Sequence, residues 1–147
     1  MADIVFNIAL GRVAYYASLP AANDALIAVP FASSGLGTDA ALRDCATLTA
    51  VKALATEQTT IGRQTLASVT VTVDNTNDRV ALDCADVVWT TPTGAAVGAV
   101  VICYVPDTTA QSDSTTIPLT KHGISWSPDG NTFTLGVADF IRTNSAA

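Results

Sequence analysis

The stretch Gly98-Ala99-Val100-Val101-Ile102-Cys103-Tyr104-Val105 decides the fold, because it is an unbroken run of small and apolar residues that ends at Pro106-Asp107. The run has the length and the β-branched content of a strand in a hydrophobic core. It lies inside an uncharged segment, residues 87–106, that is about as long as a membrane helix. Pro92 and Gly94 interrupt that segment, so we expect strand, turn and strand, and no membrane span.

The chain after residue 60 has the two-residue period of strands. Within residues 63–73, valines at 69, 71 and 73 alternate with threonines, which predicts a half-buried strand. The polar residues 74–78 predict a turn, and short apolar runs at 80–82 and 87–89 continue the chain as a meander. Near the end, Ile124 and Trp126 on one strand and Phe133, Leu135 and Val137 on the next predict a hairpin around residues 127–131.

The chain before residue 60 is rich in alanine and predicts helix, strand and helix. Ile8 to Leu19 has near-helical spacing of apolar residues, with Asn7 as the expected N-cap and Pro20 as the stop. Residues 25–31 predict a buried strand, which Pro30 should place near a sheet edge. A second helix should open at Asp44 or Thr47 and end near residue 56.

These elements predict an α+β fold, with short N-terminal helices and one early strand followed by a mostly antiparallel C-terminal sheet or sandwich. With 147 residues the chain fits a single domain, 1–147, in which 1–60 forms the helix-strand-helix part and 61–147 the β-rich part.

The charge composition narrows the classes of partner. The formal net charge is −6 and the seven Lys and Arg residues are scattered, so binding to a nucleic-acid backbone is not expected. Charged residues make up only 14% of the chain, and the mean hydropathy is +0.37. Neutral polar surface loses its water at a lower cost than charged surface, which favours a subunit of an assembly. No secretory signal is predicted, so we expect synthesis and assembly in a reducing cytoplasm.

Residues that could carry chemistry are few, and we predict no catalytic, cofactor-binding or metal-binding residue. The single histidine, His122, could serve a small hydrolase with Ser125, Asp129 or Cys103, but a structural histidine is the stronger interpretation. Residues 74–78 offer oxygen ligands at alternate positions, yet they lack the glycine and the glutamate of an EF-hand loop. The three cysteines form no CxxC pair, so we expect buried thiols, with a single disulfide as the alternative.

The candidate assembly contacts lie near the N-terminus. Residues 1–6 are too short to bury themselves locally and could form a contact arm together with the first helix. The apolar and aromatic side chains that we expect at such contacts are Ile4, Phe6, Tyr15 and Tyr16. The aromatic residues Trp89, Tyr104 and Trp126 are expected to anchor the core or an interface.

Five segments, taken in order, carry a family resemblance that covers most of the chain. They are Asn7-Ile8-Ala9 with Gly11-Arg12-Val13, the stretch from Val69 to Val80, Trp89-Thr90, Cys103 to Asp107, and Ile117 to His122. With these segments the chain resembles a family of small virion proteins of tailed bacteriophages, chiefly phages of actinobacteria. It departs from that family in having few acidic residues in its second helix and an added cysteine there.

The resemblance implies a virion structural protein without catalytic activity. The role we expect is capsid decoration on the head surface, with the major capsid protein, further copies of this chain, or both as partners. A head-tail connector, a tail component or a host-surface-binding module is the alternative. A ring-forming tail protein would need long loops that cross between subunits, and residues 108–116 are the candidate for such a loop.

Overall fold

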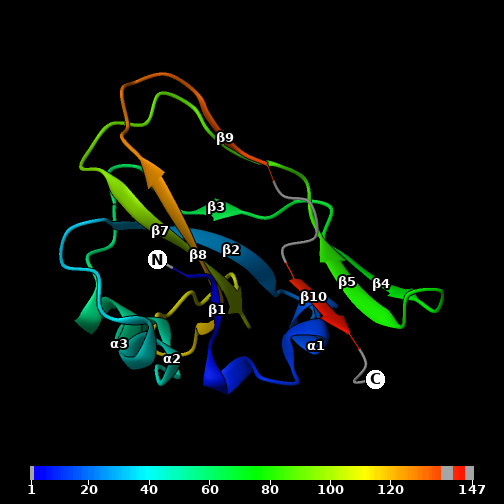
Figure 1. Cartoon of the computed structure of the whole chain (residues 1–147). Helices are drawn as coiled ribbons and strands as arrows, with labels where there is room; N and C mark the ends of the chain where they lie inside the picture. Colours follow the sequence, from blue (N-terminus) through cyan, green and yellow to red (C-terminus); the bar gives the residue numbers. More distant parts are fainter. Residues whose placement is uncertain (1, 137–140, 145–147) are drawn as a thin grey trace.

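A five-stranded antiparallel sheet lies at the centre of the protein. The structure is a computed structural model that describes residues 2–136 and 141–144. Within these residues the strand order of the central sheet is β1-β8-β7-β2-β3 (Figure 1). The strands are β1 (Ile4–Val5), β2 (Ala25–Ala32), β3 (Gln64–Thr65), β7 (Val97–Val105) and β8 (Ile117–Trp126). The predicted core strand is therefore confirmed as β7, the middle strand of the sheet.

Strand β7 is buried along nearly its whole length because both faces of the central sheet are covered. Its odd-numbered residues 101, 103 and 105 face a core formed with Leu42 of α2 (Asp39–Arg43) and Leu48 and Val51 of α3 (Leu48–Leu54). Its even-numbered residues 100, 102 and 104 face a second core. A strand covered on both faces needs apolar residues at successive positions, which is why this stretch shows no alternation.

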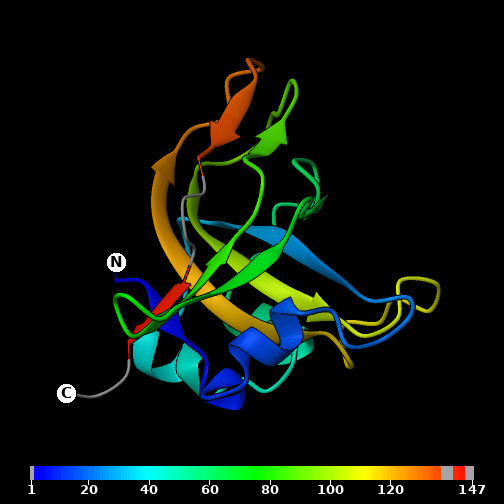
Figure 2. The same ribbon diagram turned by 90° about the vertical axis from the view of Figure 1, so that its right-hand side faces the viewer.

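The second core is closed by a helix and two small sheets. The helix is α1 (Val13–Ala17), which follows a 3-10 turn at Asn7–Ala9. One small sheet has the order β10-β5-β4, formed by β4 (Thr70–Asp74), β5 (Arg79–Asp83) and β10 (Ile141–Asn144). The other pairs β6 (Val87–Trp89) with β9 (Phe133–Leu135). Figures 1 and 2 show the β4–β5 hairpin and the β6–β9 ribbon extending from the body in different directions.

Threonine caps define the two helices that cover the first core. The Thr47 side chain accepts a hydrogen bond from the Ala50 amide, and α3 begins at the next residue, so Thr47 is confirmed as one of the two predicted starts. Thr38 caps α2 in the same way through the Ala41 amide. Leu48 and Val51 point into the core and are fully buried.

The predicted helix from Ile8 to Leu19 forms only in part. The chain makes the 3-10 turn, passes Gly11 at a positive φ of 72°, and then forms α1 over five residues. Asn7 is not an N-cap, since its side-chain amide donates to Asp44 Oδ1 at 2.8 Å. Gly11 adopts the left-handed conformation readily, and this conformation cannot continue a right-handed helix.

Strand β2 is buried and lies next to the edge strand β3, as predicted, but the strand that follows it differs from the prediction. Strand β2 lies between β7 and β3, but β3 pairs only with Ile27 and Ala28. Pro30 lies beyond that short pairing, so its missing amide hydrogen breaks no contact with β3. The predicted strand over 63–73 is divided into β3 and β4, which belong to different sheets, and Ser68 between them has a φ of 54°.

The predicted C-terminal hairpin is wrong. The predicted meander is also wrong in its last strand, because β6 pairs with β9 and not with β5. Strand β8 pairs with β7, whereas β9 pairs with β6, so the strands on either side of residues 127–131 are not neighbours. Trp126 and Phe133 nevertheless stack with ring centroids 3.9 Å apart. The apolar pattern had identified side chains that meet, but it could not show that they meet between two sheets. Val137 lies outside the described residues.

Gly98 should be the glycine most sensitive to substitution. A Cβ atom at this position would lie 2.6 Å from the Ser33 Cα atom, and that backbone is held by a hydrogen bond from the Ser33 amide to the Ala96 carbonyl. We expect Gly98→Ala to lower the free energy of unfolding by about 2 kcal/mol, the usual cost of overpacking. Urea denaturation measures the loss.

Gly136→Ala is the matched control, because a Cβ there has its nearest neighbour, Asp86 Oδ1, at 4.0 Å. We expect its stability to stay within about 0.5 kcal/mol of the parent protein. Equal stability losses in the two variants would contradict the close approach at Gly98.

Candidate functional site

Two of the four predicted contact residues, Ile4 and Phe6, are buried within their own chain. Strand β1 pairs with β8 through Ile4 and Lys121, and the Phe6 amide donates to the Leu119 carbonyl. Ile4 and Phe6 are buried in the core beneath α2 and α3. The arm is too short to bury itself locally, but it is long enough to add a strand to a distant part of the chain.

Tyr15 remains accessible, whereas Tyr16 does not. Tyr16 is buried and lies 4.8 Å from the ring of Tyr104 on β7. The Tyr104 hydroxyl donates to Asp24 Oδ2 at 2.8 Å, and burial followed by this contact raises the pKa of Tyr104 to about 12. Tyr15 packs edge-on against Tyr16 at 5.5 Å and leaves 59% of its surface exposed. Its position is therefore fixed by the core beneath it.

Other exposed apolar side chains lie on the same short segment as Tyr15. Leu10 is 61% exposed in the connection between the 3-10 turn and α1. We define the N-terminal apolar surface as the exposed apolar residues of this segment, Ile8, Leu10, Tyr15 and Leu19. Sequence reasoning found Tyr15 but missed Leu10, since a leucine in a predicted helix is normally assigned to the buried face.

His122 is a partly buried structural group. Its Nε2 atom lies 2.9 Å from Thr120 Oγ1, and its Nδ1 atom lies 3.6 Å from Asp3 Oδ2. Burial lowers the pKa of His122 below its usual value, and the Asp3 carboxylate opposes this shift only in part. The predicted alternatives placed Ser125 or Asp129 beside this imidazole, but the contacts that the structure shows are with Thr120 and Asp3.

Cys103 and His122 lie on opposite faces of the central sheet. His122 is paired with Val100, which faces the second core, whereas Cys103 faces the core beneath α2 and α3. Burial raises the pKa values of Cys103 and Cys45, and it raises the pKa of Cys84 to about 11. The prediction that the cysteines are buried thiols is confirmed. The nucleophile-base pair of the hydrolase alternative is not formed.

The oxygen-rich turn at residues 74–78 is organised by Asp74. Its Oδ1 atom accepts hydrogen bonds from the Thr76 and Asn77 amides, both at 3.1 Å. Its Oδ2 atom accepts from the Asn77 side chain at 2.7 Å and from Arg79 Nε at 3.0 Å. These contacts lower the pKa of Asp74, led by the one from the Asn77 side chain. The carboxylate closes the β4–β5 turn, which confirms the turn predicted at residues 74–78.

Four charged side chains form a closed cluster beside α3. Arg63 binds Glu57 through two hydrogen bonds of 2.7 and 2.9 Å, and it binds Asp113 at 2.8 Å. Lys52 of α3 reaches the same two carboxylates, at 3.0 Å from Glu57 and 2.8 Å from Asp113. Two positive and two negative charges therefore alternate around a ring with no net charge.

The cluster holds the loop between β7 and β8 against the body. Asp113 lies in this loop, and Thr108 in the same loop donates its amide to the Asn23 carbonyl at 2.8 Å. Residues 108–116, the expected inter-subunit loop, are therefore anchored at both ends to their own chain. Burial would raise the pKa of Glu57, but hydrogen bonds from Arg63 and Lys52 outweigh it and lower the pKa. The hydrogen bond from Arg63 does the same for Asp113.

Apart from this cluster, Lys121 is a charged residue that is fully buried. Its Nζ atom donates to the Ala2 carbonyl at 2.7 Å and to Asp39 Oδ1 at 2.8 Å. The side chain thereby joins β8 to the N-terminal residues and to the first residue of α2. The hydrogen bond from Lys121 lowers the pKa of Asp39. Both acceptors belong to the chain itself, so this ammonium group has a structural role.

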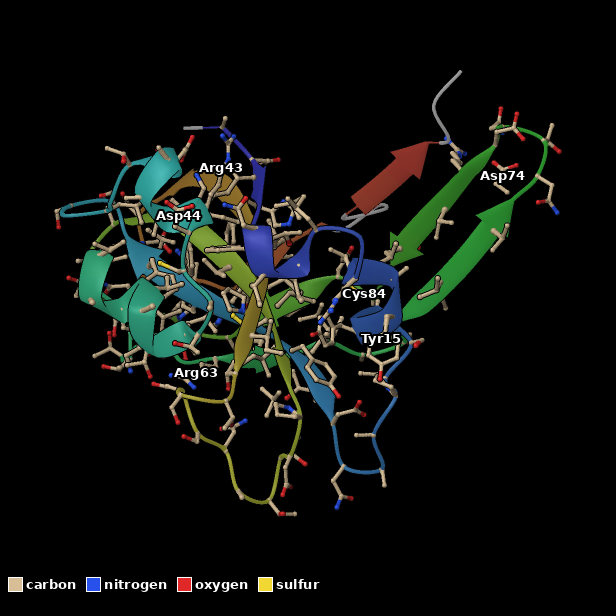
Figure 3. The ribbon with its side chains drawn as sticks, turned by 90° about the horizontal axis from the view of Figure 1, so that it is seen from below. Tyr15, Arg43, Asp44, Arg63, Asp74 and Cys84 are labelled. Carbon is tan, nitrogen blue, oxygen red and sulfur yellow. The ribbon has the colours of Figure 1, made fainter. Side chains whose placement is uncertain are left out.

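The described residues contain no group of three or more His, Cys, Asp or Glu side chains arranged to hold a metal ion. In the same part of the chain, no helix is both long enough and apolar enough to cross a membrane. The features that suit contact with another molecule are the N-terminal apolar surface and the projecting β4–β5 hairpin. Figure 3 shows Tyr15 on α1 near the base of this hairpin and Asp74 at its far end.

The charged cluster should make stability depend on pH in the acid range. Because the folded-state pKa of Glu57 lies below the ordinary value of 4.5, its contribution is complete above that value and is lost as the pH falls through the folded pKa. We expect the stability difference between the parent protein and Glu57→Gln to narrow as the pH falls from about 5 to about 3. Urea denaturation at each pH measures it.

Asp78→Asn, at an exposed position of the β4–β5 turn, controls for the loss of one negative charge. A stability difference for Glu57→Gln that stays constant across this pH range would contradict the assigned role of the cluster.

Replacement of Lys121 should separate the contribution of its buried stem from that of its charge. Lys121→Ala removes the packed stem together with both hydrogen bonds, and we expect a loss of about 3 kcal/mol in the free energy of unfolding. Lys121→Met keeps most of the volume, and the Asp39 carboxylate that it leaves is partly exposed to water, so we expect a loss of about 1 kcal/mol. Thermal and urea denaturation measure both. If Met were as destabilising as Ala, the ion pair and not the packing would dominate.

Comparison with known proteins identifies no relative for this fold and these surfaces. No protein-family model matches the chain, and neither a curated protein nor a solved structure matches it significantly. The resemblance to virion proteins of tailed phages therefore stays a prediction. In the described residues the polar clusters bind their own chain, while the N-terminal apolar surface remains open.

Proposed function

We propose that the protein is a structural component of a bacteriophage virion, and more specifically a capsid decoration protein of the head. The observation that carries the proposal is the N-terminal apolar surface, on which Leu10 and Tyr15 are mostly exposed although the core beneath them is closed. Exposed apolar side chains that gather on one segment suit contact with another protein. In this role the surface would lie against the major capsid protein or a neighbouring copy.

The rigidity of the surface supports this role. Tyr15 is held through Tyr16, Tyr104 and Asp24, so little side-chain freedom would be lost when the surface docks. Many copies on one shell act together, so a modest interface suffices for each. The protein would then clamp neighbouring capsid subunits and oppose the pressure of the packaged genome through buried area, without a chemical step.

A component of the tail or of the head-tail junction is the second candidate. The projecting β4–β5 hairpin favours it, because ring-forming proteins use such hairpins to reach the next subunit (Figures 1 and 2). The loop at 108–116, which the sequence suggested for this purpose, is bound to its own chain through Asp113 and Thr108. The two candidates differ in the part of the particle that the protein occupies.

Gold-labelled antibody on intact particles distinguishes them, with purified protein as the blocking control. Label spread over the head surface in many copies is the expected result. Label confined to the neck or tail would replace decoration by the second candidate. Particles without label would count against both candidates.

The contact surface can be tested separately on heads assembled without this protein. We expect the double variant Leu10→Ser, Tyr15→Ser to bind such heads at least about tenfold more weakly, since each truncated side chain removes at least about 1 kcal/mol of apolar burial. Stability should change little because both side chains are exposed in the free protein. Co-sedimentation with heads measures the binding.

Val88→Ser is the matched control, an exposed apolar residue on β6 outside the N-terminal apolar surface. If it weakened binding as much as the double variant does, the contact would have to be placed elsewhere.

A further inference from the structure

Strand β4 has an unpaired outer edge. It is the last strand of the sheet β10-β5-β4 and is paired with β5 over its whole length, from Thr70 with Asp83 to Asp74 with Arg79. None of the other described strands pairs with its second edge. Half of the amide and carbonyl groups of an antiparallel strand point away from its single partner, so this edge presents a row of open hydrogen-bonding groups.

The edge lacks the devices that normally prevent pairing with another chain. Such edges usually carry a lysine, a proline, a bulge or very few residues. Strand β4 is Thr70-Val71-Thr72-Val73-Asp74, and its register with β5 is regular throughout. Its one charge, Asp74, is bound to Arg79 and Asn77 at the end of the hairpin. Val73 is 65% exposed, although its neighbour on the same face, Val71, packs on the second core.

The sequence of β4 is complementary to itself in the antiparallel direction. If Thr72 lies opposite Thr72 of a second copy, Val71 and Val73 lie opposite each other, and Thr70 lies opposite Asp74. All five residues are then paired, valine meets valine on the same face, and no two like charges meet. Val73 would gain an apolar neighbour in Val71 of the second copy, which accounts for an exposed valine at this position.

We infer that β4 pairs with β4 of a second copy of this chain around a twofold axis at Thr72, joining two three-stranded sheets into one of six strands. The hairpin extends from the body, so the second copy can approach this edge (Figure 3). Two five-residue strands bury less area than a standard interface, so the dimer should dissociate on dilution and be favoured where copies are held close together. The inference rests on β4 alone and does not depend on the proposed virion role.

Disulfide trapping with Thr72→Cys tests the pairing. Residues directly opposite in an antiparallel pair have Cα atoms about 4.5 or about 5.5 Å apart, and both distances lie in the range that a disulfide spans. Thr72 is exposed, and the native thiols are buried, so the new thiol is the reactive one. We expect mild oxidation to convert most of this variant to a covalent dimer on a non-reducing gel. Val88→Cys, exposed on another strand, should stay monomeric.

Charge substitutions at Thr72 test the twofold register without a covalent bond. Thr72→Lys and Thr72→Glu each place two like charges opposite each other, so each should weaken self-association by about fivefold. An equal mixture of the two variants should associate at least as well as the parent protein, because opposite charges then meet. Sedimentation equilibrium measures the parent protein, the two variants and their mixture.

Three results would overturn the inference. One is a Thr72→Cys protein that stays monomeric although its thiol reacts freely with a small reagent. Another is cross-linking no faster than that of Val88→Cys. The third is failure of the mixed Lys and Glu variants to associate better than either variant alone. These measurements use purified protein, so their failure leaves the labelling of particles unaffected, and the reverse also holds.

Discussion

The burial of both faces of β7 is the constraint on which the rest of the structure depends. A central strand with apolar residues on both sides needs a packed layer on each face, and in this chain the two layers are built from different elements. Helices α2 and α3 close one face, whereas α1 and the two small sheets close the other. Each cover takes its side chains from segments far apart in sequence, so the cores join the N-terminal and C-terminal parts of the chain in one body.

The polar groups reinforce this arrangement. Lys121 fastens the N-terminal residues and α2 to β8, and the four-charge cluster fastens the loop between β7 and β8 to α3. In both places the charged groups are matched within the chain, which limits the cost of their burial. Groups that are satisfied in this way have little capacity left for a ligand. Open surfaces in the described part of the chain include the N-terminal apolar surface and the outer edge of β4, both of which suit contact between proteins.

The sequence predicted correctly those features that depend on a few neighbouring residues. The core strand at β7, the cap at Thr47, the turn at Asp74 and the burial of the three cysteines were all predicted from short stretches. The N-terminal arm and the C-terminal hairpin failed for a common reason. In both, the chain pairs with a distant strand, β8 for the arm and β6 for β9, and no local signal gives the partner of a strand.

The sequence by itself determined the α+β class, the main core strand, Thr47 as one of two candidate caps of α3, and the shortage of catalytic groups, because periodicity, capping and composition act over a few residues. Tertiary structure alone decided that Phe6 is buried while Leu10 and Tyr15 are exposed, that His122 and Cys103 lie on opposite faces, and that β4 has an open edge. Exposure depends on which surfaces the rest of the chain covers, and strand pairing joins residues far apart in sequence. Both are properties of the assembled fold.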